Sequence, residues 1–375
     1  MNTPATQPGS LWIIGRRADL LWIFGGAYLS LLLVLPLYAW PASVPVVFWL
    51  WALCLDGPHI WATYSRTYCD RYFLHQHPYL AGFSLLWLIL PLTLVYLSKA
   101  LNQPWIFELF LALALLWAFY HIVRQHYGFV SLYDRKQNTP RHQHRLHGRL
   151  LYLGLWIPYV HFISNHPRNR IFYDIDPSSL PAAFEPLIFW TPIVISSGVG
   201  IVLIYLLVRS HFRSIALWFT FSCLFSQAII FYGVVHLEPL YQLAQKPAEY
   251  FMTVTVLSTL FHNLQYLAIV WLYNHRSYAA DADTQRSLHG LAVPLNLSLR
   301  RFLVAGVVFA SVYTYLEWHM GEYPSLNGVT YASEGLAWAI GLWWGLSLHH
   351  YYLDQKIWRT GSNPVLRSTL IDRLG

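Results

Sequence analysis

Ten long apolar stretches divide this sequence, and they limit its fold more than any other feature. A helix that crosses a bilayer needs about 20 mainly apolar residues, and most of the stretches approach that length, although the fifth and ninth are shorter. They cover roughly residues 19–40, 44–65, 79–98, 104–127, 149–164, 188–208, 214–235, 249–274, 301–318 and 334–354. We therefore expect an all-α, polytopic transmembrane bundle of about ten helices, forming one integral membrane domain over residues 1–375.

The composition excludes an ordinary soluble domain. The chain is 56% hydrophobic and only 11% charged, whereas soluble domains carry about 25% charged residues to cover their surface. The three cysteines, Cys54, Cys69 and Cys223, lie far apart. Their spacing argues against both a disulfide framework and a thiolate metal site.

The basic residues indicate the orientation of the helices. If the N-terminus is cytoplasmic and the stretches alternate in direction, 20 of the 24 Lys and Arg residues fall on the cytoplasmic side. The four on the other side are Lys99, Arg168, Arg170 and Lys246. This positive-inside bias predicts two cytoplasmic termini and cytoplasmic loops at about 128–148 and 275–300. The net charge of +7 is then a topology signal that gives no support to a nucleic-acid partner. The expected location is a bacterial inner membrane.

Histidines are the strongest candidates for chemistry. The chain has 18, and several lie inside apolar stretches, where ionisable groups are costly and commonly functional. The candidate metal ligands are His59, His121, His126, His262, His349 and His350. They belong to the second, fourth, eighth and tenth stretches, which all run toward the cytoplasm. We expect at least three of them to share one metal centre, with His262 deeper in the membrane than the rest.

Imidazole is the commonest side-chain metal ligand, and it suits iron, copper and zinc. A ligating histidine usually donates its second ring N–H to a neighbouring acceptor, and the candidates for orienting the rings are Asp56, Gln125, Gln265 and Asp354. His349 and His350 point about 100° apart on one helix, so a single ion is not expected to bind both. The competing interpretation of each histidine is a hydrogen-bonded packing residue.

Two short patterns resemble known membrane oxygenases. The pair His121-x4-His126 resembles the first histidine box of membrane fatty-acid desaturases and hydroxylases. The pair His349-His350 resembles the adjacent histidines of their later boxes. Those families use HxxHH boxes, whereas this chain lacks the upstream histidine.

The distribution of His59, His121, His262 and His350 over four helices is similar to a second family, the Brp/Blh-type β-carotene dioxygenases. In that family, histidines from separate transmembrane helices hold an iron. Both resemblances imply iron, dioxygen and a lipophilic substrate.

The leading functional hypothesis is a membrane-bound oxidoreductase. It would use non-haem iron and O₂ to hydroxylate, desaturate or cleave a lipid, isoprenoid or carotenoid. Copper is a second candidate metal, membrane lipids are expected neighbours, and an electron-donor protein is a candidate partner. The alternatives are a haem b electron-transfer protein acting with quinone, which would be coloured, and a proton-coupled transporter, which would bind no metal.

Overall fold

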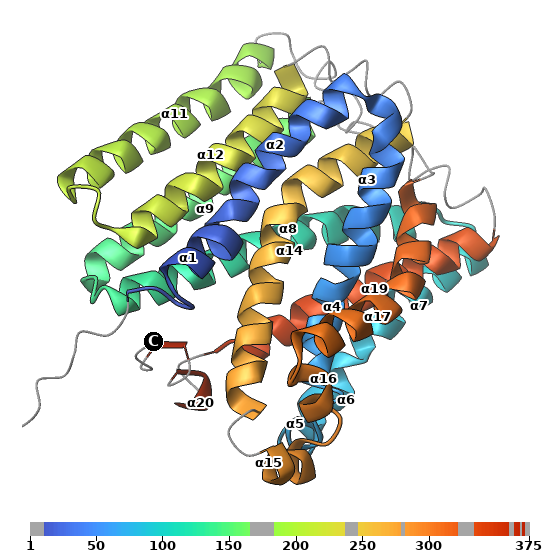
Figure 1. The fold of residues 1–375 in the computed structure, drawn as a ribbon. Helices are drawn as coiled ribbons and strands as arrows, with labels where there is room; N and C mark the ends of the chain where they lie inside the picture. The colour runs from blue at the N-terminus through green and yellow to red at the C-terminus, as the bar shows by residue number, and fades with distance from the viewer. Residues whose placement is uncertain are drawn as a thin grey trace, which may run out of the picture.

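The chain is built from helices over the residues that the structure, a computed structural model, describes. These are residues 11–165, 184–236, 247–278, 282–321, 334–359, 364–367 and 370–371. They are 88% helical and contain no strand. The all-α fold class is therefore confirmed, and a helix occupies each of the ten apolar stretches (Figure 1).

The first three stretches are interrupted helices. The first contains α1 (Arg16–Ala18), a π-helical segment (Asp19–Phe24) and α2 (Gly25–Ala39). The second contains α3 (Val44–Trp51), a π-helical segment (Ala52–Asp56) and α4 (Gly57–Ser65). The third contains α6 (Pro78–Ser84) and α7 (Leu86–Ala100).

The other stretches hold long helices, and short helices connect some of them. The long ones are α8 (Trp105–Lys136), α9 (Arg141–Asn165), α11 (Glu185–Arg209), α12 (Ile215–His236), α14 (Pro247–Tyr278), α17 (Leu299–Gly321) and α19 (Glu334–Ile357). The short ones are α5 (Arg71–Gln76), α15 (Ala282–His289), α16 (Ala292–Asn296) and α20 (Pro364–Arg367). All four lie toward the lower end of the bundle in Figure 1, where α15 contacts α5 and α16, and α20 lies apart from them.

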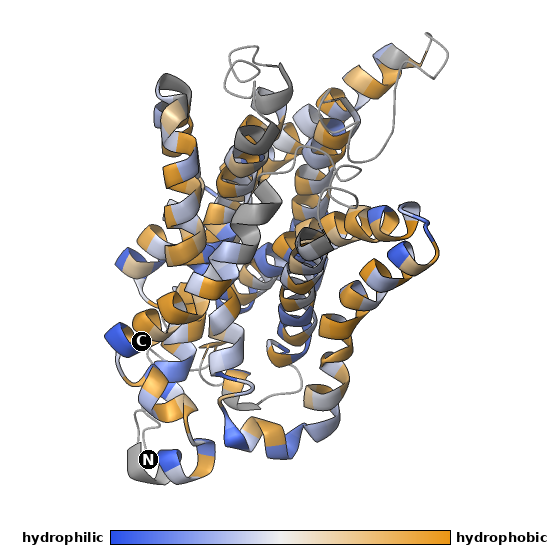
Figure 2. Ribbon diagram, turned by 90° about the vertical axis from the view of Figure 1, so that its right-hand side faces the viewer, coloured by the Kyte–Doolittle hydropathy of each residue, from blue (hydrophilic) through white to orange (hydrophobic). Residues whose placement is uncertain are grey.

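Seven spans of the described chain are long and apolar enough to cross a bilayer. The long helices are largely hydrophobic along their length, and several hydrophilic segments gather at the lower end (Figure 2). Apolar side chains also cover outward faces: Val304, Val308 and Val312 of α17 recur every four residues and are 55–67% exposed. Such faces suit contact with lipid rather than water. The chain is a multi-pass integral membrane protein.

The two predicted cytoplasmic loops differ from expectation. Most residues of 128–148 and 275–300 are helical, because α8 continues to Lys136, α9 begins at Arg141, and α15 and α16 occupy much of the second segment. These segments are polar but carry few helix-breaking residues, so the helices continue beyond the apolar stretches. The two segments therefore connect the apolar stretches largely as helices.

Hydrogen bonds join the extended ends of α8 and α9. The Asp134 carboxylate accepts from Nδ1 of His144 at 2.9 Å and from Nδ1 of His147 at 2.9 Å. Gly148 allows the close approach, since a Cβ there would lie 2.8 Å from the Tyr127 ring. Packing between the two helices thus stabilises a segment that its polarity alone would assign to a loop.

Two apolar clusters flank a polar centre. One is formed mainly by the N-terminal helices with α8, α9, α12 and α14, and includes Phe119, Phe219 and Phe261. The other is formed by α7, the start of α8, α17 and α19, and includes Phe107 and Trp344. Helices α4, α8, α14 and α19 meet between the clusters, where α4 contacts α14 and α19, and α8 contacts both as well.

Candidate metal centre

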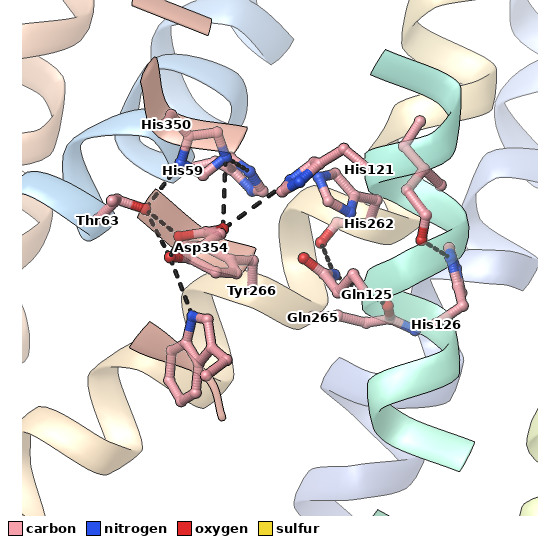
Figure 3. A network of polar contacts seen from close by, with 12 residues as sticks. His59, Thr63, His121, Gln125, His126, His262, Gln265, Tyr266, His350 and Asp354 are labelled. Atoms are coloured by element: carbon pink, nitrogen blue, oxygen red, sulfur yellow. Dashed lines mark hydrogen bonds and ion pairs between the residues drawn. The ribbon is translucent and has the colours of Figure 1, made fainter. Parts of the chain in front are cut away.

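Four buried histidines from four helices converge at this meeting point. His59 comes from α4, His121 from α8, His262 from α14 and His350 from α19, and none is more than 4% exposed. Nε2 of His59 lies 2.7 Å from Nε2 of His350. The ring centroid of His262 lies 4.5 Å from that of His59 and 4.9 Å from that of His121. The rings face one another in a single group (Figure 3).

The local structure before His59 explains how α4 reaches this group. Pro58 has no backbone N–H, and in a regular α-helix its ring would clash with the carbonyl four residues earlier. A π-helical segment, Ala52–Asp56, widens the helix at this point. Gly57 then permits tight packing on α17, because a Cβ there would lie 2.4 Å from Cβ of Ala310.

The ring nitrogens are arranged as ligand atoms would be. His59, His121 and His262 place ligand atoms within 4.8 Å of one another, and His121, His350 and Asp354 do the same. Nδ1 of His59, Nε2 of His121 and Nδ1 of His262 are buried and have no hydrogen-bond partner among the described residues. Buried polar atoms are rarely left unpaired, because desolvating them is costly. An ion among these nitrogens would satisfy them.

Asp354 connects the histidines to a hydrogen-bond network. Its Oδ1 accepts from the Thr63 hydroxyl at 2.7 Å and from the Tyr266 hydroxyl. Its Oδ2 faces the rings, 3.6 Å from Nε2 of His350 and 3.9 Å from Nε2 of His121. One oxygen is therefore held by hydroxyl donors, while the other remains directed at the centre.

The network also assigns the tautomer of His350. Nδ1 of His350 lies 2.7 Å from Oγ1 of Thr63. Because Thr63 gives its only proton to Asp354, the histidine is the donor in this contact and Nε2 carries the lone pair. The adjacent Nε2 atoms of His59 and His350 cannot both be protonated at 2.7 Å. Neutral imidazoles with inward lone pairs are the form that binds metal ions.

Two predicted ligands lie outside the group. Nδ1 of His126 donates to the Ile122 carbonyl at 2.8 Å, and its ring packs on Phe261. His126 stands five residues after His121, which turns it about 140° around α8. His349 instead hydrogen-bonds Tyr64.

The surroundings of His349 form a separate polar cluster. Its Nδ1 lies 3.0 Å from the Tyr64 hydroxyl, and its Nε2 lies 3.0 Å from Oγ of Ser84 and 3.1 Å from the Tyr68 hydroxyl. The expected 100° separation from His350 accounts for this placement. Of the six candidate ligands, the structure brings together four and directs His126 and His349 elsewhere.

The predicted orienting residues act mostly on the backbone rather than on the rings. Gln125 donates to the His262 carbonyl at 2.8 Å and to Oε1 of Gln265 at 3.2 Å. Gln265 in turn donates to the Ile23 carbonyl at 2.9 Å. These amides tie α8, α14 and the first span together beside the centre. Of the four predicted orienting residues, Asp354 is the one that faces the histidine rings.

Asp56 also differs from its predicted role. Its Oδ1 accepts from Nδ2 of Asn263 at 2.9 Å. This contact links the end of the π-helical segment to α14, one residue beyond His262. Asp56 therefore joins the side chain of Asn263, beside His262, instead of holding the ring of His59.

Thr63 and Tyr266 were not among the predicted site residues. Each follows a predicted ligand by four residues, Thr63 after His59 and Tyr266 after His262. Residues spaced by four share a helix face, so this spacing would have identified both. Their hydroxyls lie 2.6 Å apart and both contact Asp354.

An apolar cavity of about 160 Å³ adjoins the group. His59, His121 and His262 form part of its wall, and aromatic side chains such as Phe119 and Trp344 form much of the rest. Asp56 is the one charged side chain among the described residues that line it. The volume is similar to that of a dry cavity known to bind benzene, about 150 Å³. It accommodates one ring or a short piece of hydrocarbon chain.

Comparison with protein-family models, with curated proteins and with solved structures finds no match for this chain.

Proposed function

We propose that the chain is a membrane metalloenzyme, in which a non-haem iron centre carries out O₂-dependent oxidation of a lipophilic substrate. One observation carries the proposal: four buried imidazoles from four helices converge with a carboxylate, and three of their ring nitrogens have no hydrogen-bond partner in the part of the chain that the structure describes. Such a group is costly inside a membrane protein unless it is used.

The donor set fits iron. Nitrogen ligands from histidine together with one carboxylate are the ligands of non-haem iron oxygenases, and His121, His350 and Asp354 supply two histidines and a carboxylate. His59 and His262 would complete the coordination. When bound, the iron would supply the activation of dioxygen. Copper remains the second candidate, since imidazole suits it too.

The protein would contribute orientation and a dry environment. Thr63 and Tyr266 hold Oδ1 of Asp354 and leave Oδ2 directed at the rings. The apolar cavity beside His121 would hold the reacting part of a lipid, isoprenoid or carotenoid and keep water from it. Because the cavity is small, the rest of such a substrate would extend beyond it.

Two other functions receive less support. A haem with two histidine ligands needs a flat slot for the macrocycle between two opposed rings. The ring centroids of His59, His121 and His262 instead lie 4.5–6.2 Å from one another in one converging group, which leaves no such slot between them. A proton-coupled transporter would use hydrogen-bonded histidines as a relay. The unpartnered nitrogens of His59, His121 and His262 favour a ligand instead.

The topology we propose has ten spans, with α9, α17 and α19 added to the seven apolar ones, and both termini in the cytoplasm of a bacterial inner membrane. Membrane lipids would surround the bundle and be a source of substrate. A hydroxylation or desaturation would also need an electron-donor protein. Labelling of single cysteines introduced at Arg209 and Lys99 would test this topology, because the first should react only from the cytoplasm and the second only from outside.

The function is tested by oxygen uptake. Iron-loaded protein in nanodiscs, supplied with a reductant and a set of lipids, isoprenoids and carotenoids, should consume O₂ with one class and place ¹⁸O in, or remove hydrogen from, that class. His121→Ala should reduce uptake to background, while His142→Ala, at an exposed position of α9, should leave it unchanged. A Soret band in the purified protein would support the haem alternative, and metal-independent proton uptake the transporter.

A further inference from the structure

A second cavity shares His121 with the first and continues toward the C-terminal end of α8. Its volume is about 380 Å³, within the range of small-molecule pockets, about 300–1,000 Å³. We call it the basic vestibule, because Arg124, Arg135 and Arg359 line it. Asp354 and Tyr266 lie in its wall, so the vestibule reaches the histidine group along the C-terminal part of α8, whereas the apolar cavity reaches it along the N-terminal part.

The vestibule follows one face of α8. Its lining residues on this helix include His121, Arg124, Gly128 and Arg135, which recur at helical spacing. On a rise of 1.5 Å per residue, the face extends about 21 Å from the histidine to the last arginine. Arg124 lies only about 4.5 Å along the helix axis from His121, the proposed metal ligand.

The charges of the two cavities are opposite. Among its described lining residues, the vestibule has three arginines and one carboxylate, Asp354, whose Oδ1 is already held by two hydroxyl donors. The apolar cavity has Asp56 and no cation among its described lining residues. An anion would therefore be repelled from the apolar cavity and attracted to the vestibule.

The vestibule also has suitable donors. Gln355 lies in its wall, and its buried Nε2 has no hydrogen-bond partner within the described ranges. Arg124 uses one guanidinium N–H on the Tyr152 hydroxyl, at 3.2 Å, and a guanidinium has five such donors in a fork that matches carboxylate and phosphate.

We infer that the basic vestibule binds the carboxylate or phosphate headgroup of an amphiphilic substrate, whose chain passes His121 into the apolar cavity. The assignment to a substrate rests on the proposed function, whereas the anion site itself does not need the metal. Because Arg124 is one helical turn from His121, the carbons next to the headgroup would lie nearest the histidines.

Binding to metal-free protein in neutral-lipid nanodiscs tests the inference. Dodecyl phosphate and laurate are the amphiphilic probes, dodecanol lacks the charge, and inorganic phosphate lacks the chain. We expect the two anionic amphiphiles to bind at least about tenfold more tightly than dodecanol, since a hydrogen bond to a charged group contributes about 1.5–3 kcal/mol. Equal binding of dodecanol would overturn the inference.

Variants identify the site. The triple change Arg124→Gln, Arg135→Gln and Arg359→Gln should weaken dodecyl phosphate binding about 100-fold or more, and Arg124→Lys should lose less than Arg124→Gln because it keeps the charge. The matched control changes three exposed arginines outside the vestibule to glutamine: Arg209, Arg300 and Arg301. Equal effects of the two triple variants would also overturn the inference.

Two further outcomes are informative. One distinguishes a lipid headgroup from a free anion, and the other distinguishes the anion site from the proposed metal-dependent function. In the first, inorganic phosphate displaces bound dodecyl phosphate at an equal concentration, and does so only when the three arginines are present. In that case the site serves a free anion, and the headgroup assignment is overturned. If dodecyl phosphate binds through the arginines but the protein retains no metal, the proposed function fails and the anion site stands.

Discussion

The change Thr63→Val tests whether the hydroxyl network tunes the centre. Valine keeps the shape of threonine but cannot accept the Nδ1–H of His350, which now lies 2.7 Å from Oγ1. Asp354 keeps the hydrogen bond from Tyr266, so the buried donor that loses its partner is Nδ1–H of His350. That costs about 1–3 kcal/mol, which matches the 10–100-fold loss of metal affinity typical when such a supporting residue is removed.

The assay is a competition titration of iron(II) against a chelator of known affinity, using purified protein under anaerobic conditions. We expect the dissociation constant of Thr63→Val to rise about 10–100-fold and Thr63→Ser to stay near the wild type. Thr67→Val is the matched control, because Thr67 is equally buried and its hydroxyl donates to the Thr63 carbonyl, at 2.8 Å, and not to Asp354. A dissociation constant for Thr63→Val within twofold of the control would refute the reasoning.

Three further predictions follow from the same contacts. His126→Ala should leave the iron stoichiometry unchanged, because its Nδ1 serves the Ile122 carbonyl; loss of iron comparable to that in His121→Ala would show that the ligand set is wrong. Gly57→Ala should force α4 away from α17 and lower both the melting temperature and the iron occupancy, whereas Gly198→Ala, with open space around it, should change neither in a thermal unfolding assay. Acidification should release the iron before the helices unfold, since protons compete with the metal for imidazole nitrogens; coincident metal release and loss of helical circular dichroism would contradict this.

Much of the fold could be predicted from hydrophobicity, because a membrane demands long apolar helices. The ten stretches all became helices, and seven spans of the described chain are both long and apolar enough to cross a bilayer. The ends were predicted less well. Helix α8 continues nine residues past the predicted end at 127, to Lys136, because packing against α9 and not hydrophobicity determines where it stops.

The depth of His262 shows the same effect at the centre. From the apolar stretches it should lie deeper than its partners. In the structure it lies 16 residues before the end of α14 and His121 lies 15 residues before the end of α8, because both helices are longer than expected. The two rings can therefore meet, with centroids 4.9 Å apart.

The candidate site was predicted in outline but not in detail. The assignment of the histidines to predicted helices was enough to indicate that His59, His121, His262 and His350 could come together. The choice between His349 and His350 depends on the rotation of α19, which the apolar pattern does not determine closely. The roles of Gln125 and Gln265 depend on contacts between helices distant in sequence, and a single sequence contains no direct signal for those contacts.

The most direct test is the metal content of the purified protein and of two ligand variants, measured by elemental analysis. The account predicts stoichiometric iron in the wild type and strongly reduced iron in both His121→Ala and His262→Ala, with Thr67→Val equal to the wild type. Sub-stoichiometric iron, copper and zinc in active wild-type protein, or full occupancy in both histidine variants, would contradict it.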